Sequence, residues 1–396
     1  MLINLRNALM TGKRLPYDAE VEYLESSGTQ WINTGYYPNN NTKLQYRCFS
    51  ASSGTACGCM NGIGWKPSFS LVFYTGVSPR WGTNANTSYT PFTWANVDIT
   101  VEQDKDCYLN GQLVRSYTDT QFQMQYPLIV FDRSELNNNH DPYEGKVYYL
   151  KIFENGVLVR DYIPVRVGSG SSAVGYLYDR VSGKLFGNAG TGDFVLGPDV
   201  VPVEYIESHG TEYIDTGVYG SQNLRTTFDY QLEYSGTAPV AMGLFGCYTS
   251  GMKYYLYCSG VAPSQFQVGM GDSYINTIPV DDVRHSIEFN NGTVSIDGNV
   301  VATFNPYGAQ TAYTLLLFAL HNISGGLYSM TPMRKWRVQM WDNGTPVRDY
   351  VPVRVGTDAT SWEGAMMDVL TRRIYRNART GAFGYGNDLK YPIPAE

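Results

Sequence analysis

The stretch that decides the fold is VEYLESSGT at residues 21–29, because it returns as VEYIESHGT at residues 203–211. A second block, NGVLVRDYIPVRVG at residues 155–168, returns as NGTPVRDYVPVRVG at residues 343–356. The offsets are 182 residues (203 minus 21) and 188 residues (343 minus 155). Two blocks in one order at nearly one offset indicate a duplicated domain, since solenoid repeats have periods of only about 20–50 residues. We expect features that recur in both copies to serve the fold, and features that differ to mark divergent function.

The sequence around these blocks predicts strands joined by tight turns. Residues 146–153 (KVYYLKIF) and 334–341 (RKWRVQMW) each run into an Asn-Gly pair, at Asn155 and Asn343. Asn-Gly accepts the positive φ angles that two-residue hairpins require. Beyond the first residues no long amphipathic pattern is present. The prediction is an all-β chain of two tandem antiparallel β-sandwich domains of the jelly-roll type.

The domain boundary is predicted near residues 196–202, LGPDVVP, where two prolines and a glycine interrupt strand pairing. This gives an N-terminal tail at residues 1–17, a first domain at 18–198 and a second at 199–396. The tail has leucines at helical spacing, so a short docking helix and an unstructured tail both stay open.

The composition excludes several partners. The chain has 29 Lys and Arg against 36 Asp and Glu, a net charge of −7, and no basic run, which argues against nucleic acid. The longest apolar run, at residues 315–320, is far shorter than the roughly 20 residues of a membrane span. The first ten residues do not have the pattern of a signal peptide. The six cysteines do not recur between the copies, which predicts free thiols from a reducing compartment.

The recurring motifs resemble the concanavalin A-like lectin and laminin-G-like jelly rolls that are common in bacteriophage virion proteins and gut-bacterial surface proteins. The resemblance rests on the two blocks above and on LYDRVSGKLF at residues 177–186, and it extends from about Asp18 onward. The second copy has MMDVLTRRIY at residues 366–375 instead, without the Ser-Gly turn. Whatever that turn supports is therefore expected to be absent there.

The resemblance implies a non-enzymatic phage virion surface protein, such as a head fibre, decoration or receptor-binding component, that binds cell-surface or mucus glycans. Such a protein is made in the host cytoplasm and needs no signal peptide, because virions leave by lysis; otherwise the location would be extracellular. The tail would dock onto other virion proteins. Since the fold also hosts spacers and enzymes, two alternatives stay open. One is a structural protein with protein contacts only, in a homo-oligomer, and the other is a glycoside hydrolase.

Catalytic carboxylates are sought first, since glycosidases of this fold use a closely spaced pair. The nearest match is Glu20, Glu22 and Glu25, but the second copy has Pro202 in place of Glu20. The recurring carboxylates are expected to be solvated or salt-bridged. The recurring Arg-Asp pairs are expected to form structural ion pairs or strand-end hydrogen bonds; they are Arg160-Asp161 and Arg348-Asp349.

No cofactor is predicted, with calcium as the alternative. The loop at residues 132–141 has enough oxygen atoms to hold Ca²⁺, whereas its counterpart at 321–326 has no carboxylate. A solvated loop is the preferred interpretation.

Aromatic side chains in the divergent middle of each copy are the predicted glycan-binding residues, because sugars stack their C–H faces on aromatic rings. The alternative for each is a place in the core. The candidates are Trp65, Trp81, Tyr89 and Trp94 in the first copy, and Tyr255 and Tyr274 in the second.

Overall fold

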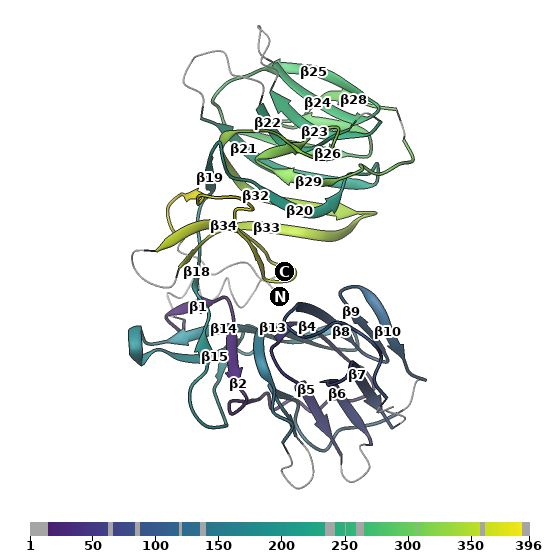
Figure 1. Cartoon of the computed structure of the whole chain (residues 1–396), viewed down its shortest axis with the longest axis vertical. Helices are drawn as coiled ribbons and strands as arrows, with labels where there is room; N and C mark the ends of the chain where they lie inside the picture. Colours follow the sequence, from purple (N-terminus) through teal and green to yellow (C-terminus); the bar gives the residue numbers. More distant parts are fainter. Residues whose placement is uncertain are drawn as a thin grey trace. The chain divides into compact units, whose positions relative to one another are not determined.

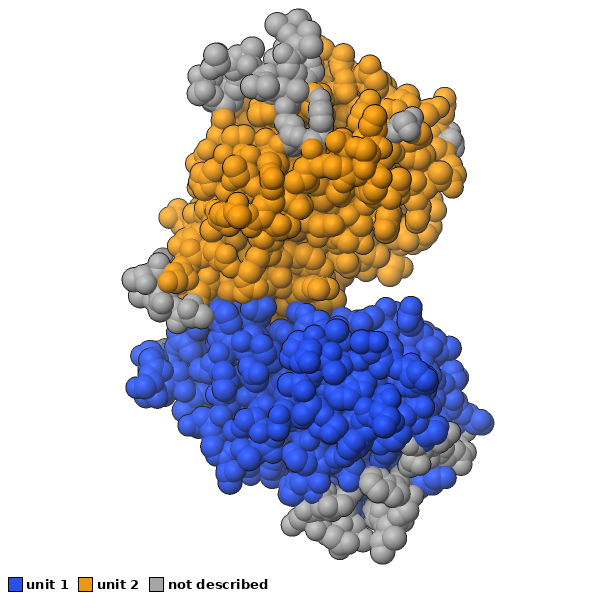
Figure 2. All heavy atoms as spheres, in the orientation of Figure 1, with its two compact units in different colours: residues 1–200, 395 blue, residues 201–394, 396 orange. Residues whose placement is uncertain are grey.

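The computed structural model describes residues 15–61, 66–83, 88–118, 121–134, 140–233, 242–249, 251–258, 265–305, 307–356 and 361–389. The chain divides into two compact units between Val200 and Val201 (Figure 2). Each unit has its own hydrophobic core. Apart from one 3-10 turn (η1, Gly170–Ser172), the described residues form strands, turns and irregular segments (Figure 1). None of the described segments forms a helix long and apolar enough to cross a membrane.

The predicted all-β fold is confirmed in both units. The strands of unit 1 are β1 (Ala19–Val21), β2 (Leu24–Ser27), β3 (Ile32–Asn33), β4 (Thr42–Ser50), β5 (Gly54–Met60), β6 (Ser68–Phe73), β7 (Val77–Gly82), β8 (Asp98–Gln103), β9 (Asp106–Leu109), β10 (Gln112–Ser116), β11 (Ile129–Val130), β12 (Arg133–Ser134), β13 (Glu144–Glu154), β14 (Val157–Val167), β15 (Val174–Asp179), β16 (Lys184–Phe186) and β17 (Val195–Leu196). The linking strand is β18 (Asp199–Pro202). Those of unit 2 are β19 (Ile206–His209), β20 (Ile214–Tyr219), β21 (Leu224–Leu232), β22 (Met242–Tyr248), β23 (Lys253–Cys258), β24 (Gln265–Gly271), β25 (Ser273–Pro279), β26 (His285–Asn290), β27 (Thr293–Ile296), β28 (Asn299–Thr303), β29 (Thr314–Leu317), β30 (Ala319–His321), β31 (Leu327–Met330), β32 (Pro332–Asp342), β33 (Thr345–Gly356), β34 (Trp362–Asp368), β35 (Arg373–Tyr375) and β36 (Gly384–Tyr385).

Each unit is a sandwich of two sheets, which we call the back and the front sheet. The back sheet has β8–β4–β13–β14–β15 at its centre in unit 1 and β26–β21–β32–β33–β34 in unit 2, all antiparallel. The front sheet runs β3–β11–β5–β6–β7 in unit 1 and β20–β29–β22–β23–β24–β25 in unit 2. Alternate residues of both sheets point inward and form the core, as period-2 patterns require.

The opening motif recurs because its polar side chains close a loop. Ser26 donates to the carbonyl of Gln30, and Gln30 Oε1 accepts from the backbone N–H of Ser27 at 2.8 Å. The second copy repeats this with Ser208 and Glu212, whose Oε2 accepts from the N–H of His209 at 2.7 Å. The glycine of each loop, Gly28 or Gly210, has a φ angle of 93° or 94°, which disfavours any side chain.

The predicted Asn-Gly hairpins are confirmed. Asn155 and Gly156 have φ angles of 51° and 75°, and Asn343 and Gly344 have 48° and 79°. These are the positive values of the tight turns that match the twist of antiparallel strands.

The expected loss of a turn in the second copy is wrong. In unit 1, Asp179 accepts from Val181 N and from the Ser182 hydroxyl, and Gly183 follows with φ 71°. In unit 2, Asp368 accepts from the N–H of Leu370 and from the hydroxyl of Thr371, and Arg372 follows with φ 50°. The turn is kept because threonine supplies the same hydroxyl and an arginine adopts the left-handed backbone.

The predicted tail at residues 1–17 ends earlier than its proposed boundary. Tyr17 is buried against Ile163 and Val165, with Leu15 beside them. Its ring lies 5.0 Å from that of Tyr178, centroid to centroid. Leu15 to Tyr17 are therefore part of unit 1, and residues 1–14 lie outside the described ranges.

Candidate functional site

The outer face of the front sheet differs between the two copies. In unit 2, β23 places Tyr254 in the core, and Tyr255 and Tyr257 on the opposite, outer face. Across the sheet, Tyr255 pairs with Gly246 on one side and Gly269 on the other, and Gly269 pairs with Tyr274 of β25. A Cβ at Gly269 would come within 2.5 Å of the Tyr255 ring, so glycine is what lets this ring lie flat along the sheet.

These tyrosines line a depression of about 190 Å³, which we call the tyrosine depression. Tyr255 lies at its centre, only 1 % exposed, with the rings of Tyr248 and Tyr257 packed edge-on at 5.5 and 6.4 Å. Tyr274 stands at its rim with 52 % of its surface exposed. The lining residues are Tyr248, Tyr255, Tyr257, Gln267, Tyr274 and Leu320. The depression thus offers several aromatic surfaces around one small volume.

The polar groups of the depression are amides and hydroxyls. The Tyr255 hydroxyl donates to Gln267 Oε1 at 2.6 Å, and Gln267 Nε2 donates to Asn276 Oδ1 at 3.1 Å. Burial raises the pKa of Tyr255, so its hydroxyl stays protonated. Asn276 is exposed, so its side-chain N–H groups can donate to a ligand. No charged side chain lines the depression among the described residues.

The same face of unit 1 is built from small and charged residues. Gly58 and Ser70 take the places of Gly246 and Tyr255 in the ladder, and Arg80 takes that of Gly269. Arg133, which is 5 % exposed, lies beside Gly58 and forms an ion pair with Asp141 at 2.9 Å. The aromatic depression therefore belongs to the second copy, as expected of a diverged function.

The structure separates the six predicted glycan-binding residues. Tyr255 and Tyr274 lie together in the tyrosine depression. Trp65 falls outside the described residues.

Trp81 points into the core, and the prediction that it offers a surface platform is wrong. It is 1 % exposed and packs edge-on against Phe122 at 5.1 Å. Its ring borders a hollow of about 470 Å³ with polar neighbours that include Asn40 and Gln45. Because this ring belongs to the core cluster of unit 1, whereas Tyr255 lies outside the core cluster of unit 2, Trp81 cannot stack on a sugar without local opening of the sandwich.

Trp94 and Tyr89 are also kept apart. Trp94 is half-buried against Phe73 at 5.7 Å and serves the core of unit 1. Tyr89 is 36 % exposed and packs edge-on against Tyr74, whose hydroxyl donates to Asp141. The first copy therefore does not bring its described candidates into one site.

Four further residues line the depression but were not among the predicted binding residues: Tyr248, Tyr257, Gln267 and Leu320. The alternation of Tyr255 and Tyr257 along one strand is a signal that could have identified Tyr257. Gln267 lies on the next strand, where only the ladder register shows that it joins the depression, and it donates to Asn276 on the strand after that. Leu320 reaches the depression because Phe318 adopts a φ angle of 69°, and the resulting turn places β30 beside β22.

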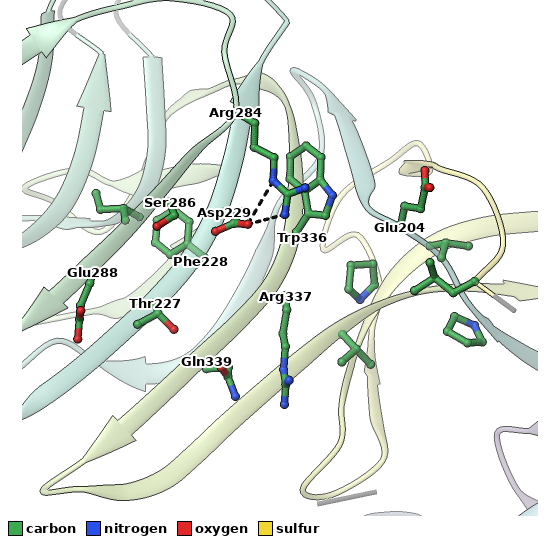
Figure 3. A pocket seen from close by; sticks show the side chains of 16 residues that line it. Glu204, Thr227, Phe228, Asp229, Arg284, Ser286, Glu288, Trp336, Arg337 and Gln339 are labelled. Carbon is green, nitrogen blue, oxygen red and sulfur yellow. Dashed lines mark hydrogen bonds and ion pairs between the residues drawn. The ribbon is translucent and has the colours of Figure 1, made fainter. Parts of the chain in front are cut away.

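A wider hollow of about 460 Å³ lies on the outer face of the back sheet of unit 2 (Figure 3). Arg284 stacks over Trp336 at 4.1 Å and pairs with Asp229 (Figure 3). Arg337 pairs with Asp349. The cations that line this hollow are thus engaged by carboxylates of the same face.

This back-sheet arrangement recurs in unit 1, which indicates a role in the fold. Arg47 stacks over Tyr148 at 3.8 Å and pairs with Asp98 at 2.6 Å. Arg47 occupies the ladder position of Asp229, and Asp98 that of Arg284, so the ion pair is kept with its charges exchanged. Exchanging the two charges leaves the ion pair within the protein intact, but it changes the charges that a ligand would contact. The ion pair is therefore kept for the fold.

The carboxylates considered for catalysis have structural partners. Glu25 lies 3.9 Å from Lys146, and Glu207 lies 3.1 Å from Arg334. Asp161 pairs with Arg180 at 2.8 Å rather than with its neighbour Arg160.

The loop considered for calcium is described only at its ends. Asp141 accepts from Thr55 and Arg133, and Asp132 from the backbone N–H of Asp141. Residues 135–139 lie outside the described ranges. In the part of the chain that is described, no group of three or more His, Cys, Asp or Glu side chains is placed to hold a metal ion.

All six cysteines are buried. Burial raises the pKa of Cys48 to about 12 and that of Cys247 to about 11. Since the thiolate is the reactive form, these thiols are structural.

Fold and depression together define a tandem jelly-roll protein with an uncharged aromatic depression on its second unit. No protein-family model and no curated protein sequence matches the chain. Among solved structures it is similar to domains LG4-5 of the mouse laminin alpha1 chain, at 12 % identity and a TM-score of 0.27, covering 85 % of this chain and 93 % of the laminin chain. It is also similar to the NanB sialidase from Streptococcus pneumoniae, at 9 % identity and a TM-score of 0.23, covering 92 % of this chain and 80 % of the sialidase.

Proposed function

We propose that the chain is a non-enzymatic glycan-binding protein whose second unit holds a sugar in the tyrosine depression. The observation that carries this proposal is the grouping of Tyr248, Tyr255, Tyr257 and Tyr274 around one small volume. The faces of aromatic rings carry partial negative charge, which attracts the polarised C–H groups of a sugar ring. The amide of Asn276 and the hydroxyls of the tyrosines would hydrogen-bond to the sugar hydroxyls.

The ligand class that fits this lining is a neutral sugar. An acidic sugar would bring a carboxylate or sulfate against tyrosine rings, and an anion without a paired cation is costly to bury. Lys253 lies 5.9 Å from the Tyr248 ring, but its ammonium donates to the carbonyl of Asp272. Uncharged polysaccharides should therefore bind better than acidic ones of similar length.

The direct test is Tyr274→Ala in affinity electrophoresis against a panel of bacterial polysaccharides and mucin. We expect the wild-type chain to be retarded and the variant to bind at least about tenfold more weakly, a loss of about 1.4 kcal/mol. Folding should be unaffected because Tyr274 is 52 % exposed.

Tyr219→Ala is the matched control, since Tyr219 is 48 % exposed on the same sheet and lies outside the depression. Equal retardation of the Tyr274 variant and the wild type would refute the assignment of the site. Reducing ends released in the same tubes would show an enzyme instead.

We further propose that the protein belongs to the surface of a phage particle and that residues 1–14 dock it there, as the resemblance implies. Deleting these residues should abolish incorporation into particles and leave both units folded, because Leu15 and Tyr17 remain to pack on unit 1. Incorporation is measured by immunoblotting of purified particles, and folding by circular dichroism. Normal incorporation of the truncated chain would contradict the docking role.

A further inference from the structure

Strand β25 (Ser273–Pro279) ends the front sheet of unit 2. It pairs with β24 on one side, and among the described residues no strand pairs with its other side. Residues 273–276 are exposed in succession, including Tyr274 at 52 % and Ile275 at 37 %. The free side of such a strand presents a row of backbone donors and acceptors to another strand.

Between Ser273 and Asn276 this edge lacks the usual protection against pairing. Natural edge strands carry lysines, prolines or bulges, whereas the sequence SYINTIP has no charged residue and its proline comes last. Its register with β24 is continuous from Ser273 to Asn276 and shifts only towards Gln265. At the opposite end of the same sheet, β20 is interrupted between Asp215 and Tyr219, where Gly217 has φ 68°.

The edge is also particular to the second copy. In unit 1 the described front sheet ends at β7, whose residues are all buried and include Pro79. Val77 of β7 is bridged by Thr90, and Pro91 follows. Within the described ranges, the second copy thus has an additional, open strand on the sheet that carries the tyrosine depression.

We propose that β25 pairs antiparallel with β25 of a second copy of this chain. Antiparallel pairing of a strand with itself is self-complementary and closes as a twofold dimer, so no other partner strand is required. Because the strand is uncharged, self-pairing brings no like charges together. Pro279 has no N–H to donate, which limits the contact to residues 273–277.

The dimer would make glycan binding bivalent, a consequence that rests on the proposed function. The twofold axis of such a pair is perpendicular to the sheet, so both depressions lie on one face of a continuous sheet. Tyr274 belongs to β25 itself, which places the two depressions close to the axis. A linked pair of weak sites binds a polymeric glycan far more tightly than either site alone.

The test measures the mass of the full-length chain by sedimentation equilibrium over a range of concentrations. We expect a dimer for the wild type and a monomer for Ile275→Lys, since a lysine on an edge strand opposes pairing. Ile275 alternates with Tyr274 and points away from the depression, so binding of a short oligosaccharide should be unchanged. This separates a failure of the dimer from a failure of the glycan site.

Two exposed edge positions serve as controls. Leu113→Lys changes β10 of unit 1, where Leu113 is 54 % exposed, and should leave the dimer intact. Val300→Lys changes β28, the edge of the back sheet in unit 2, where Val300 is 64 % exposed. Dissociation by Val300→Lys but not by Ile275→Lys would overturn the proposal and place the contact on β28.

Hydrogen exchange of the wild type provides a readout that needs no variant. The amides of residues 273–277 should become more protected as the protein concentration rises. A wild-type chain that stays monomeric at every concentration, or protection of β25 that does not change with concentration, would overturn the proposal.

Discussion

Lys335→Met should raise the free energy of unfolding of unit 2 by about 1–3 kcal/mol, the usual cost of a buried polar group without a hydrogen bond. Lys335 is fully buried in β32, and its Nζ lies 3.9 Å from the centroid of the Phe228 ring. Among the described residues no group accepts a hydrogen bond from this amine. Methionine keeps the length of the side chain and removes the amine, so it leaves little cavity.

The first copy provides the reciprocal experiment. Val147 of unit 1 occupies the position that Lys335 has in unit 2. Val147 pairs with Leu24 of β2, and Lys335 pairs with Ile206, the residue of β19 that corresponds to Leu24 in the repeated opening motif. Val147→Lys should therefore destabilise unit 1 and leave unit 2 unchanged. Hydrogen exchange assigns each change to its unit, and an unchanged or lowered stability of unit 2 in Lys335→Met would count against this account.

The gain from Lys335→Met should depend on pH. Burial lowers the pKa of Lys335 well below its ordinary value, so between the two pKa values the unfolded chain binds the proton that the folded chain has lost. The stability of wild-type unit 2 therefore rises with pH over that interval. Methionine removes this dependence, and its advantage should shrink as the pH is raised from neutral towards alkaline. Urea unfolding of the wild type and of Lys335→Met at several pH values measures this change in the stability difference.

The hairpins, the all-β class and the duplication could be predicted because each depends on local sequence. The Asn155-Gly156 pair determines the backbone conformation of its own turn, and the repeated blocks show directly that the domain is duplicated. The side chains of the site are harder to predict from the sequence, because the register of strand pairing decides which face of the sheet each side chain occupies. β22 and β23 shift register between Gly243 and Phe245, which the sequence does not signal.

Aromatic residues make this ambiguity worse, since tryptophan and tyrosine suit a core and a surface equally. Trp81 and Tyr274 each lie on a strand with period-2 alternation, yet Trp81 faces the core and Tyr274 faces solvent. Lys335 shows the reverse case: a lysine at an inward position, where a polar residue would be expected to face water. Only pairing across the sheet settles these positions, and pairing joins residues far apart in the chain.

Asp368→Ala should destabilise unit 2 by roughly 3 kcal/mol or more, because it leaves several buried groups without a hydrogen-bond partner. The Asp368 carboxylate is fully buried and accepts from the N–H groups of Asp349 and Leu370 and from the Thr371 hydroxyl. This is a large part of the roughly 5–15 kcal/mol that stabilises a typical domain. Urea unfolding followed by hydrogen exchange should show the loss confined to unit 2.

The same change in the other copy tests whether this carboxylate organises the fold of each unit. Asp179 makes the equivalent contacts, to Asp161 N, Val181 N and the Ser182 hydroxyl, so Asp179→Ala should destabilise unit 1 alone. Asp368→Asn is the conservative control: its amide oxygen can still accept from both N–H groups, and the Thr371 hydroxyl can rotate to accept from the amide. Burial raises the pKa of Asp368, so its charge is itself costly, and the neutral amide should restore most of the stability lost in Asp368→Ala. Equal losses in the alanine and asparagine variants would show that the charge, rather than the hydrogen-bonding oxygens, holds the turn.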